Sequence, residues 1–185
     1  MCHLFGLPAF TVYIASSFKH KHGVRLLGRE LRTMNCHILD WTEKAVPPSG
    51  LTPTERRIWM DTDRNGGQVY TFCKNACLAA DMLVYYGASG QDAGVEVGLA
   101  VGAGLPILGI RGPLEGPGLM LHGAVTQWTD NVEEALSITG RVVTHAAQSL
   151  ANLDSEPVAA VRSICEKLKR FIPITARPFS RHLPR

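Results

Sequence analysis

Hydrophobic residues along this chain fall into short continuous runs that are separated by amphipathic stretches. The runs are rich in β-branched and aromatic residues, which is typical of strands buried in a parallel sheet. Four such runs predict strands at Phe10–Ser16, 36–41, 81–86 and 105–110, and a weaker run predicts an edge strand at 122–128.

The stretches between the runs carry apolar residues at helical spacing. In 22–35 the residues Val24, Leu27, Leu31 and Met34 recur three or four positions apart, which predicts one apolar helix face. The same reasoning predicts further helices at 68–80, 92–104, 131–151 and 157–170.

One long polar segment interrupts this pattern. Residues 42–67 contain a double proline, turn signals and paired glycines, and leave room for a short helix only near 54–60. An irregular segment of this length in a compact domain is usually a lid or a binding loop.

Strands that alternate with helices at this spacing imply right-handed βαβ crossovers. The predicted fold is therefore α/β, a flavodoxin-like or Rossmann-like parallel sheet of about five strands with helices on both faces. Ligands bind such sheets at the carboxyl ends of the strands. Three segments are expected to meet there: 16–22, 86–96 and 111–118.

Composition and charge narrow the class of protein. A chain of 185 residues with 45% hydrophobic and 19% charged residues fits a single globular domain. The five cysteines are an odd number without regular spacing, which favours reduced thiols in the cytoplasm. The sequence shows no signal peptide and no membrane span.

The basic residues are unevenly distributed. Seven of the 19 Lys and Arg residues lie in 162–185, so we expect an α/β domain at 1–150 followed by a C-terminal helix and a basic, proline-containing tail at 151–185. Such a tail can bind nucleic acid or acidic lipid, but a solvated extension is the commoner case, and we do not expect a nucleic-acid partner.

Glu96 is the residue that raises a question of chemistry. It lies in the first turns of the glycine-rich helix, where the positive end of the helix dipole favours an ionised carboxylate. Asp92 is expected to cap that helix, and a stripe of Gly94, Gly98 and Gly102 is expected to let it pack closely against its neighbours. Glu96 is either a solvated helix-start residue or a nucleophile.

Several motifs together resemble the nucleoside 2-deoxyribosyltransferase family, whose relatives include deoxynucleoside 5′-monophosphate N-glycosidases. They are "VYIASS" in the first strand, "AAD" before the third, and a glutamate followed by xGxAxGxGxP. The last motif is formed by Glu96, Gly98, Ala100, Gly102, Gly104 and Pro106. The resemblance runs from about residue 11 to 138.

The resemblance implies roles for individual residues. Glu96 would attack C1′ of the sugar and form a covalent glycosyl-enzyme intermediate, and Tyr13, expected at the carboxyl end of its strand, would contact Glu96 or the sugar. Substrate would be held by residues in the loops after strands one and three: Ser16, Ser17, Lys19, Ser89, Asp92 and Gly94. Neither a metal nor an organic cofactor is implied.

The resemblance also implies a homodimer or larger homo-oligomer with sites completed across subunits. His122 and the C-terminal helix are candidates for that interface.

The chain departs from the family pattern at one position. Relatives often carry an aspartate eight residues before the "AAD" aspartate, where it assists the departing base, but Cys73 stands there. Asp61 and Asp63 are possible substitutes, whereas Asp81 is expected to be structural.

Other candidate residues favour structural roles. Cys73 and Cys77 are expected to be core thiols, and His20 and His22 lack partners at metal-ligand spacing. Base stacking is possible for three aromatic residues: Phe18, Trp41 and Trp59.

The function expected from these observations is cleavage or exchange of the N-glycosidic bond of a (2′-deoxy)nucleoside or its 5′-monophosphate. Two alternatives stay open. One is a hydrolase of another N-glycoside, such as a ribonucleotide or an NAD-like dinucleotide, and the other is a noncatalytic nucleotide-binding module.

Overall fold

The computed structural model describes residues 9–44 and 46–151. Its centre is a five-stranded sheet in which every paired strand is parallel, in the order β2-β1-β3-β4-β5. The strands are β1 (Phe10–Ser16), β2 (Cys36–Leu39), β3 (Met82–Tyr86), β4 (Ile107–Ile110) and β5 (Gln127–Thr129). This is the flavodoxin-like order, so the predicted α/β fold class is confirmed.

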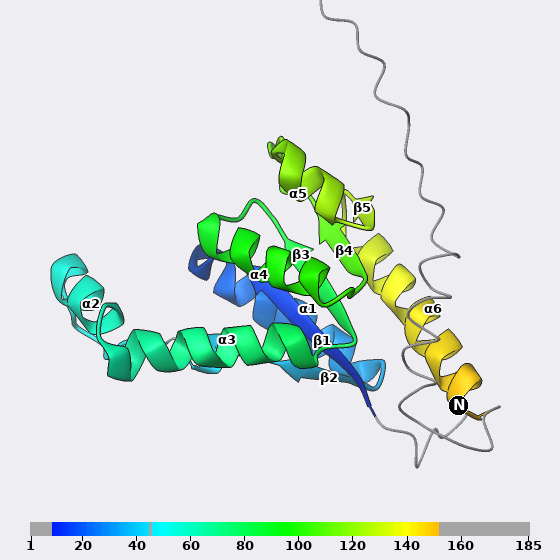
Figure 1. Cartoon of the computed structure of the whole chain (residues 1–185), viewed down its shortest axis with the longest axis horizontal. Coiled ribbons are helices and arrows are strands. Elements are labelled where there is room, and N and C mark those ends of the chain that lie inside the picture. The colour runs from blue at the N-terminus through cyan, green and yellow to red at the C-terminus, as the bar shows by residue number, and fades with distance from the viewer. Residues whose placement is uncertain (1–8, 45, 152–185) are drawn as a thin grey trace, which may run out of the picture.

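In the part of the chain that the structure describes, six α-helices connect and cover the strands (Figure 1). They are α1 (Lys21–Thr33), α2 (Pro53–Met60), α3 (Gln68–Ala79), α4 (Gln91–Gly102), α5 (Leu119–Ala124) and α6 (Val132–Ala151). Within the described residues there are also three short turns: η1 (Phe18–His20), η2 (Trp41–Glu43) and the π-helical turn η3 (Asp63–Gly67). α3 and α4 pack together and contact β1, while α1 packs against α6, so helices cover both faces of the sheet.

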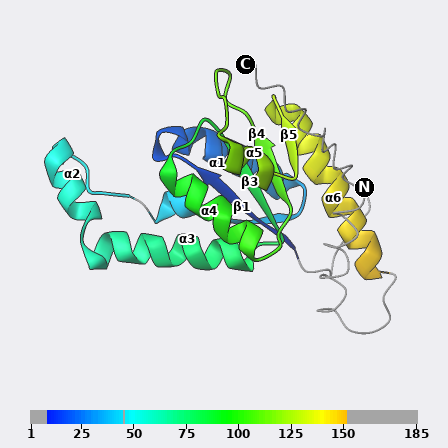
Figure 2. The same cartoon turned by 45° about the horizontal axis from the view of Figure 1, so that its top comes forward.

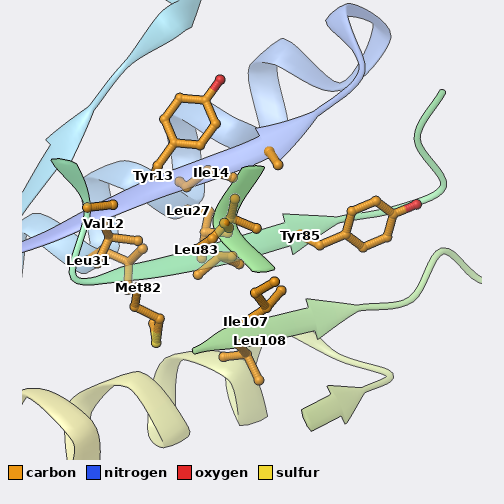
Figure 3. Packing of buried hydrophobic residues seen from close by; sticks show 14 of the residues in the cluster. Val12, Tyr13, Ile14, Leu27, Leu31, Met82, Leu83, Tyr85, Ile107 and Leu108 are labelled. Atoms are coloured by element: carbon orange, nitrogen blue, oxygen red, sulfur yellow. The ribbon is translucent and has the colours of Figure 1, made fainter. Parts of the chain in front are cut away.

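The core lies around the two central strands. Residues Val12, Tyr13, Ile14 and Ala15 of β1 are at most 1% exposed, and Leu83 of β3 is completely buried. Figure 3 shows Val12, Tyr13, Ile14 and Leu83 among Leu27 and Leu31 from α1 and Ile107 and Leu108 from β4. Each fully buried aliphatic side chain of this size contributes about 1.5–3 kcal/mol relative to an exposed one, so β1 and β3 form a rigid platform for the residues at their ends.

The polar segment 42–67 contains the short helix that was expected near 54–60. α2 begins with a capping box, in which Thr52 Oγ1 accepts a hydrogen bond from Glu55 N while the Glu55 carboxylate accepts one from Thr52 N. None of its residues is buried. Figures 1 and 2 show α2 and the beginning of α3 projecting beyond the sheet as an arm.

The edge strand expected at 122–128 is wrong over most of its length. Residues Leu119–Ala124 form α5, in which His122 N donates to Gly118 O and Val125 N to Leu121 O, and only Gln127–Thr129 pair with β4. The beginning of the segment that the apolar pattern assigned to a strand therefore forms helical hydrogen bonds instead.

The expected helix at 157–170 and the basic tail lie outside the described residues, so the division of the chain near residue 150 stays a prediction. Within residues 9–44 and 46–151, no helix has the length and apolar character needed to cross a membrane.

Candidate active site

Tyr13 and Glu96 meet where β1 packs against α4. The Tyr13 hydroxyl donates a hydrogen bond of 2.5 Å to Glu96 Oε1, and the Tyr13 side chain is completely buried. Tyr13 is the fourth of seven residues of β1, so the expectation that it ends the strand is wrong. Figure 3 shows its ring standing clear of β1, and this reach brings the hydroxyl to α4.

The two carboxylate oxygens of Glu96 differ, because among the described residues Oε1 accepts a hydrogen bond and Oε2 does not. Its Oε2 is buried without a hydrogen-bond partner in the described part of the chain. The pKa of Glu96 is raised to about 7, chiefly by burial and to a smaller extent by the charge of Asp92, while the hydrogen bond from Tyr13 and the nearby Cys73 thiol act to lower it. Both the protonated and the ionised form of Glu96 are therefore present near neutral pH.

The Tyr13 hydroxyl stays protonated, and so remains a hydrogen-bond donor, at neutral pH. Burial first, and the neighbouring Glu96 charge second, raise its pKa far above the ordinary value. The protonated hydroxyl donates to the Glu96 carboxylate, holds it in one orientation and does not itself act as a base.

Cys73 completes the group around Glu96. Its thiol lies close enough to Tyr13 and Glu96 to interact electrostatically with both, so the residue at the family's aspartate position does lie beside the carboxylate. Burial, as the largest cause, raises the Cys73 pKa to about 11, which keeps the sulfur protonated at neutral pH. Cys73 therefore offers a neutral donor where an aspartate would offer a charge.

Three serines gather at the carboxyl ends of β1 and β3. The hydroxyls of Ser16 and Ser89 both donate to Tyr86 O, at 2.8 and 2.7 Å, and Ser17 N donates to Ser89 Oγ at 3.0 Å. The structure thus brings Ser16, Ser17 and Ser89 together as expected. Lys19 is exposed and forms no hydrogen bond or ion pair with the described residues.

The expected cap of α4 is wrong. Gly90 is the N-cap, no side chain caps the helix, and Asp92 is an exposed residue of the first turn. Because α4 begins at Gln91, Asp92 lies two positions after the N-cap, inside the first turn of the helix. Its charge still acts on Glu96, whose pKa it raises.

The glycine stripe of α4 does not pack against a neighbour, contrary to expectation. A Cβ placed on Gly94, Gly98 or Gly102 would meet no atom within 4 Å. The face turned to the sheet is instead Ala93, Val97 and Ala100. Helical periodicity groups the glycines into one row, but it does not tell which row faces the core when both rows consist of small residues.

A second tyrosine–glutamate pair was not predicted. The Tyr85 hydroxyl donates to Glu115 Oε1 and accepts a 3.1 Å hydrogen bond from Ser89 N, while Glu115 Oε2 accepts from Gly112 N at 3.0 Å. Figure 3 shows Tyr85 at the end of β3, reaching toward the loops that leave the sheet. The pair ties the loop of Ser89 to the loop after β4, and the only signal in the sequence was that both loops follow neighbouring strands.

Replacing Glu115 is expected to loosen both loops. Glu115→Ala removes the acceptor of Tyr85 and of Gly112, and lost partners of this kind cost about 1–3 kcal/mol of unfolding free energy. Urea unfolding measures the loss, with the exposed Glu133→Ala as the matched control. Equal stability of the two variants would contradict this role for the pair.

Three of the remaining candidates have structural partners. Asp81 accepts a 2.8 Å hydrogen bond from Thr11 N, so its expected structural role is confirmed. Asp61 pairs with Arg57 at 3.5 Å on the exposed arm, and the side chain of Asp63 lies outside the described part.

Trp41 is 5% exposed and donates to Ile14 O, which leaves Phe18, at 40% exposure, as the freer aromatic surface.

In the described ranges 9–44 and 46–151, no three or more His, Cys, Asp or Glu residues cluster closely enough to hold a metal ion.

Removing the Tyr13 hydroxyl is expected to slow any reaction that uses the Glu96 carboxylate. Tyr13→Phe deletes a hydrogen bond to a charged group, worth about 10- to 100-fold in rate. The lost bond favoured the ionised form, so the Glu96 pKa rises further and the acid limb of the pH–rate profile moves to higher pH. Measured kcat against pH tests both effects, with the exposed Tyr70→Phe as control, and an unmoved acid limb would contradict the assignment.

Comparison with known proteins yields no family model and no curated protein that matches this chain. Two solved structures are similar to it. One is a 2-deoxyribosyltransferase from the psychrotolerant bacterium Bacillus psychrosaccharolyticus, at 17% identity and a TM-score of 0.47, covering 68% of this chain and 90% of that one. The other is the Clostridium botulinum CMP N-glycosidase BcmB, at 14% identity and a TM-score of 0.46, covering 70% and 97%. With TM-scores below 0.5, these likenesses carry no argument about activity.

Proposed function

We propose that this protein cleaves or exchanges the N-glycosidic bond of (2′-deoxy)nucleosides or their 5′-monophosphates, with Glu96 as the nucleophile. The observation that carries the proposal is the state of the Glu96 carboxylate. One oxygen is held at 2.5 Å by Tyr13, and the other is buried without a partner among the described residues. The target of the attack, the anomeric carbon, is the one that the resemblance of the glutamate motif implies.

The chemistry follows from this arrangement. Glu96 Oε2 forms a bond to C1′ while the bond from C1′ to the base nitrogen breaks. The departing base carries away the electron pair and takes up a proton from water. The Tyr13 hydroxyl orients the attacking carboxylate. A carboxylate held on one face of the sugar stabilises the oxocarbenium-like transition state and then forms the bond to C1′.

The second half of the reaction releases the sugar. Either water or another base attacks C1′ on the face that the first base left and loses a proton to solvent. The bond to Glu96 breaks, and the carboxylate regains its electron pair. Attack by water makes the protein a hydrolase, whereas attack by a base makes it a transferase. Both outcomes retain the configuration at C1′, because two displacements occur on opposite faces.

The serine cluster is the proposed site for the 5′ end of the substrate. Ser16, Ser17 and Ser89 lie at the carboxyl ends of β1 and β3, where ligands of such sheets bind. Hydroxyls and backbone amides can donate to a 5′-hydroxyl or to phosphate oxygens, and Lys19, Asp92 and Gly94 lie in the same loops or in the first turns of α4.

We also propose a cytoplasmic homodimer or larger homo-oligomer. Support comes from large apolar side chains that are exposed around α5: Leu114 is fully exposed, Leu119 is 76% exposed and Met120 is 88% exposed. His122, the expected interface residue, is exposed on α5 and stacks on Trp128 at 6.2 Å. Light scattering of the full chain measures the oligomeric state.

Incubation of the protein with 2′-deoxynucleosides and with their 5′-monophosphates, each with and without an acceptor base, tests the proposal. Formation of a new nucleoside indicates transfer, and release of free base alone indicates hydrolysis. Consumption of ribonucleotides or of an NAD-like dinucleotide instead would favour the alternative hydrolase. Binding without any turnover would contradict an enzymatic function.

A further inference from the structure

A hollow of about 240 Å³ lies between the start of α1 and the arm that carries α2. Its lining includes three cationic side chains, Lys21, Arg25 and Arg56, but neither Tyr13 nor Glu96 and no described carboxylate. None of the three cations forms an ion pair within residues 9–44 and 46–151. Three positive charges without a counter-charge make a concave surface that attracts anions.

Arg25 is oriented before any ligand arrives. Its Nε donates to Thr42 Oγ1 at 2.9 Å and its Nη2 donates to Thr42 O at 3.1 Å. Thr42 is 1% exposed and donates in turn to Asp40 Oδ1 at 2.6 Å. Asp40 accepts a hydrogen bond from the Thr42 amide and forms an ion pair with Arg32 at 3.6 Å. It forms no ion pair with Arg25 among the described residues. The N–H groups on Arg25 Nη1 are left to bind an acceptor at little entropic cost.

Lys21 is held in a similar way. Its Nζ lies 5.0 Å from the centroid of the Phe18 ring, which attracts the ammonium group by a cation–π interaction. Phe18 also lines the hollow, and the proline-rich segment 46–49 forms a stiff wall beside it. Two of the three cations are thus fixed by partners other than carboxylates.

The size of the hollow limits the ligand. Its volume of about 240 Å³ is below the ~300–1,000 Å³ that small-molecule sites usually have. We propose that it binds the phosphate or diphosphate group of a small phosphorylated molecule, whose remaining atoms extend from the mouth. This site goes beyond the proposed function, because it shares no residue with the serine cluster or with Glu96.

Calorimetric titration of the full chain with pyrophosphate and with inorganic phosphate tests the proposal. We expect binding, tighter for pyrophosphate, and a loss of about tenfold in affinity for each of Arg25→Ala and Arg56→Ala. Arg29→Ala is the matched control, because it removes the same charge from α1 outside the hollow. No binding by the wild type, or an equal loss in Arg29→Ala, would overturn the proposal.

Two features keep the test decisive. Arg56 is exposed and has no hydrogen bond or ion pair in the described part of the chain, so Arg56→Ala reports on the site even where Arg25→Ala disturbs folding through Thr42. Glu96→Gln is expected to bind pyrophosphate as tightly as the wild type. Pyrophosphate binding without glycosidic activity would therefore reject the proposed function alone, and activity without pyrophosphate binding would reject the anion site alone.

Competition identifies the source of the phosphate. If a deoxynucleoside 5′-monophosphate displaces pyrophosphate from Glu96→Gln, the substrate itself fills the hollow. If pyrophosphate stays bound while the nucleotide binds, the ligand is a separate phosphorylated molecule. Both results support a phosphate site.

Discussion

Glu96→Gln is expected to lower the rate of N-glycosidic cleavage by at least about 1,000-fold, because an amide cannot form the covalent bond to C1′ on which the proposed reaction depends. The substitution keeps the size of the side chain and an oxygen that can accept from Tyr13. Substrate affinity is expected to change little, since the serine cluster does not involve Glu96. Single-turnover kinetics with the best nucleoside or nucleotide measure the chemical step directly.

The matched control is Glu133→Gln, which makes the same chemical change at an exposed residue in the first turn of α6. It should cleave substrate at the wild-type rate. If Glu96→Gln retained more than about a tenth of the wild-type rate, another group would have to attack the sugar. A fall in both variants would point to a general effect of charge.

The same substitution is expected to stabilise the protein at neutral and alkaline pH. Burial raises the pKa of Glu96 to about 7 in the folded state from an ordinary value of 4.5. The folded protein therefore resists ionisation, and its stability falls as the pH rises from about 4.5 to about 7, by roughly 3 kcal/mol in all. Glutamine carries no charge at any pH, so Glu96→Gln escapes this loss.

The difference in unfolding free energy between Glu96→Gln and wild type should thus become roughly 3 kcal/mol more favourable to the variant between about pH 4 and about pH 8. Urea unfolding at both pH values measures this change and does not require a substrate. Other titrating groups are present in both proteins and cancel. A difference that does not depend on pH would mean that Glu96 ionises normally and is not a buried carboxylate held for chemistry.

Residues that lower the folding stability of the substrate-free protein are common at functional sites. In this chain the cost arises from the buried Glu96 oxygen without a partner, on a helix that otherwise turns small apolar residues to the sheet. The apparent mismatch between Glu96 and its glycine-rich surroundings is therefore consistent with a catalytic role.

Much of the fold could be predicted because its signals are local. The apolar run of β1 and the spacing of Val24, Leu27 and Leu31 in α1 depend only on neighbouring residues. α5 was missed because its six residues close helical hydrogen bonds that apolar content alone does not distinguish from an edge strand.

The site was harder to predict because its contacts join distant parts of the chain. The pairing of Tyr13 with Glu96 could be expected from a resemblance, but the position of Tyr13 in the middle of β1 could not be derived from the motif. The pair of Tyr85 and Glu115, 30 residues apart, has no local signal. The anion site combines α1, η2 and α2, so its three cations could be grouped only once the arm was placed.

The most direct test of a covalent role for Glu96 is mass spectrometry of peptides from protein that has been quenched with acid during turnover of a 2′-deoxynucleoside or its 5′-monophosphate. We predict that the peptide containing Glu96 gains the mass of one 2-deoxyribosyl group, and that Glu96→Gln shows no such adduct. Cleavage of substrate with the adduct on another residue, or with no adduct under conditions that trap the intermediate, would contradict the proposed mechanism.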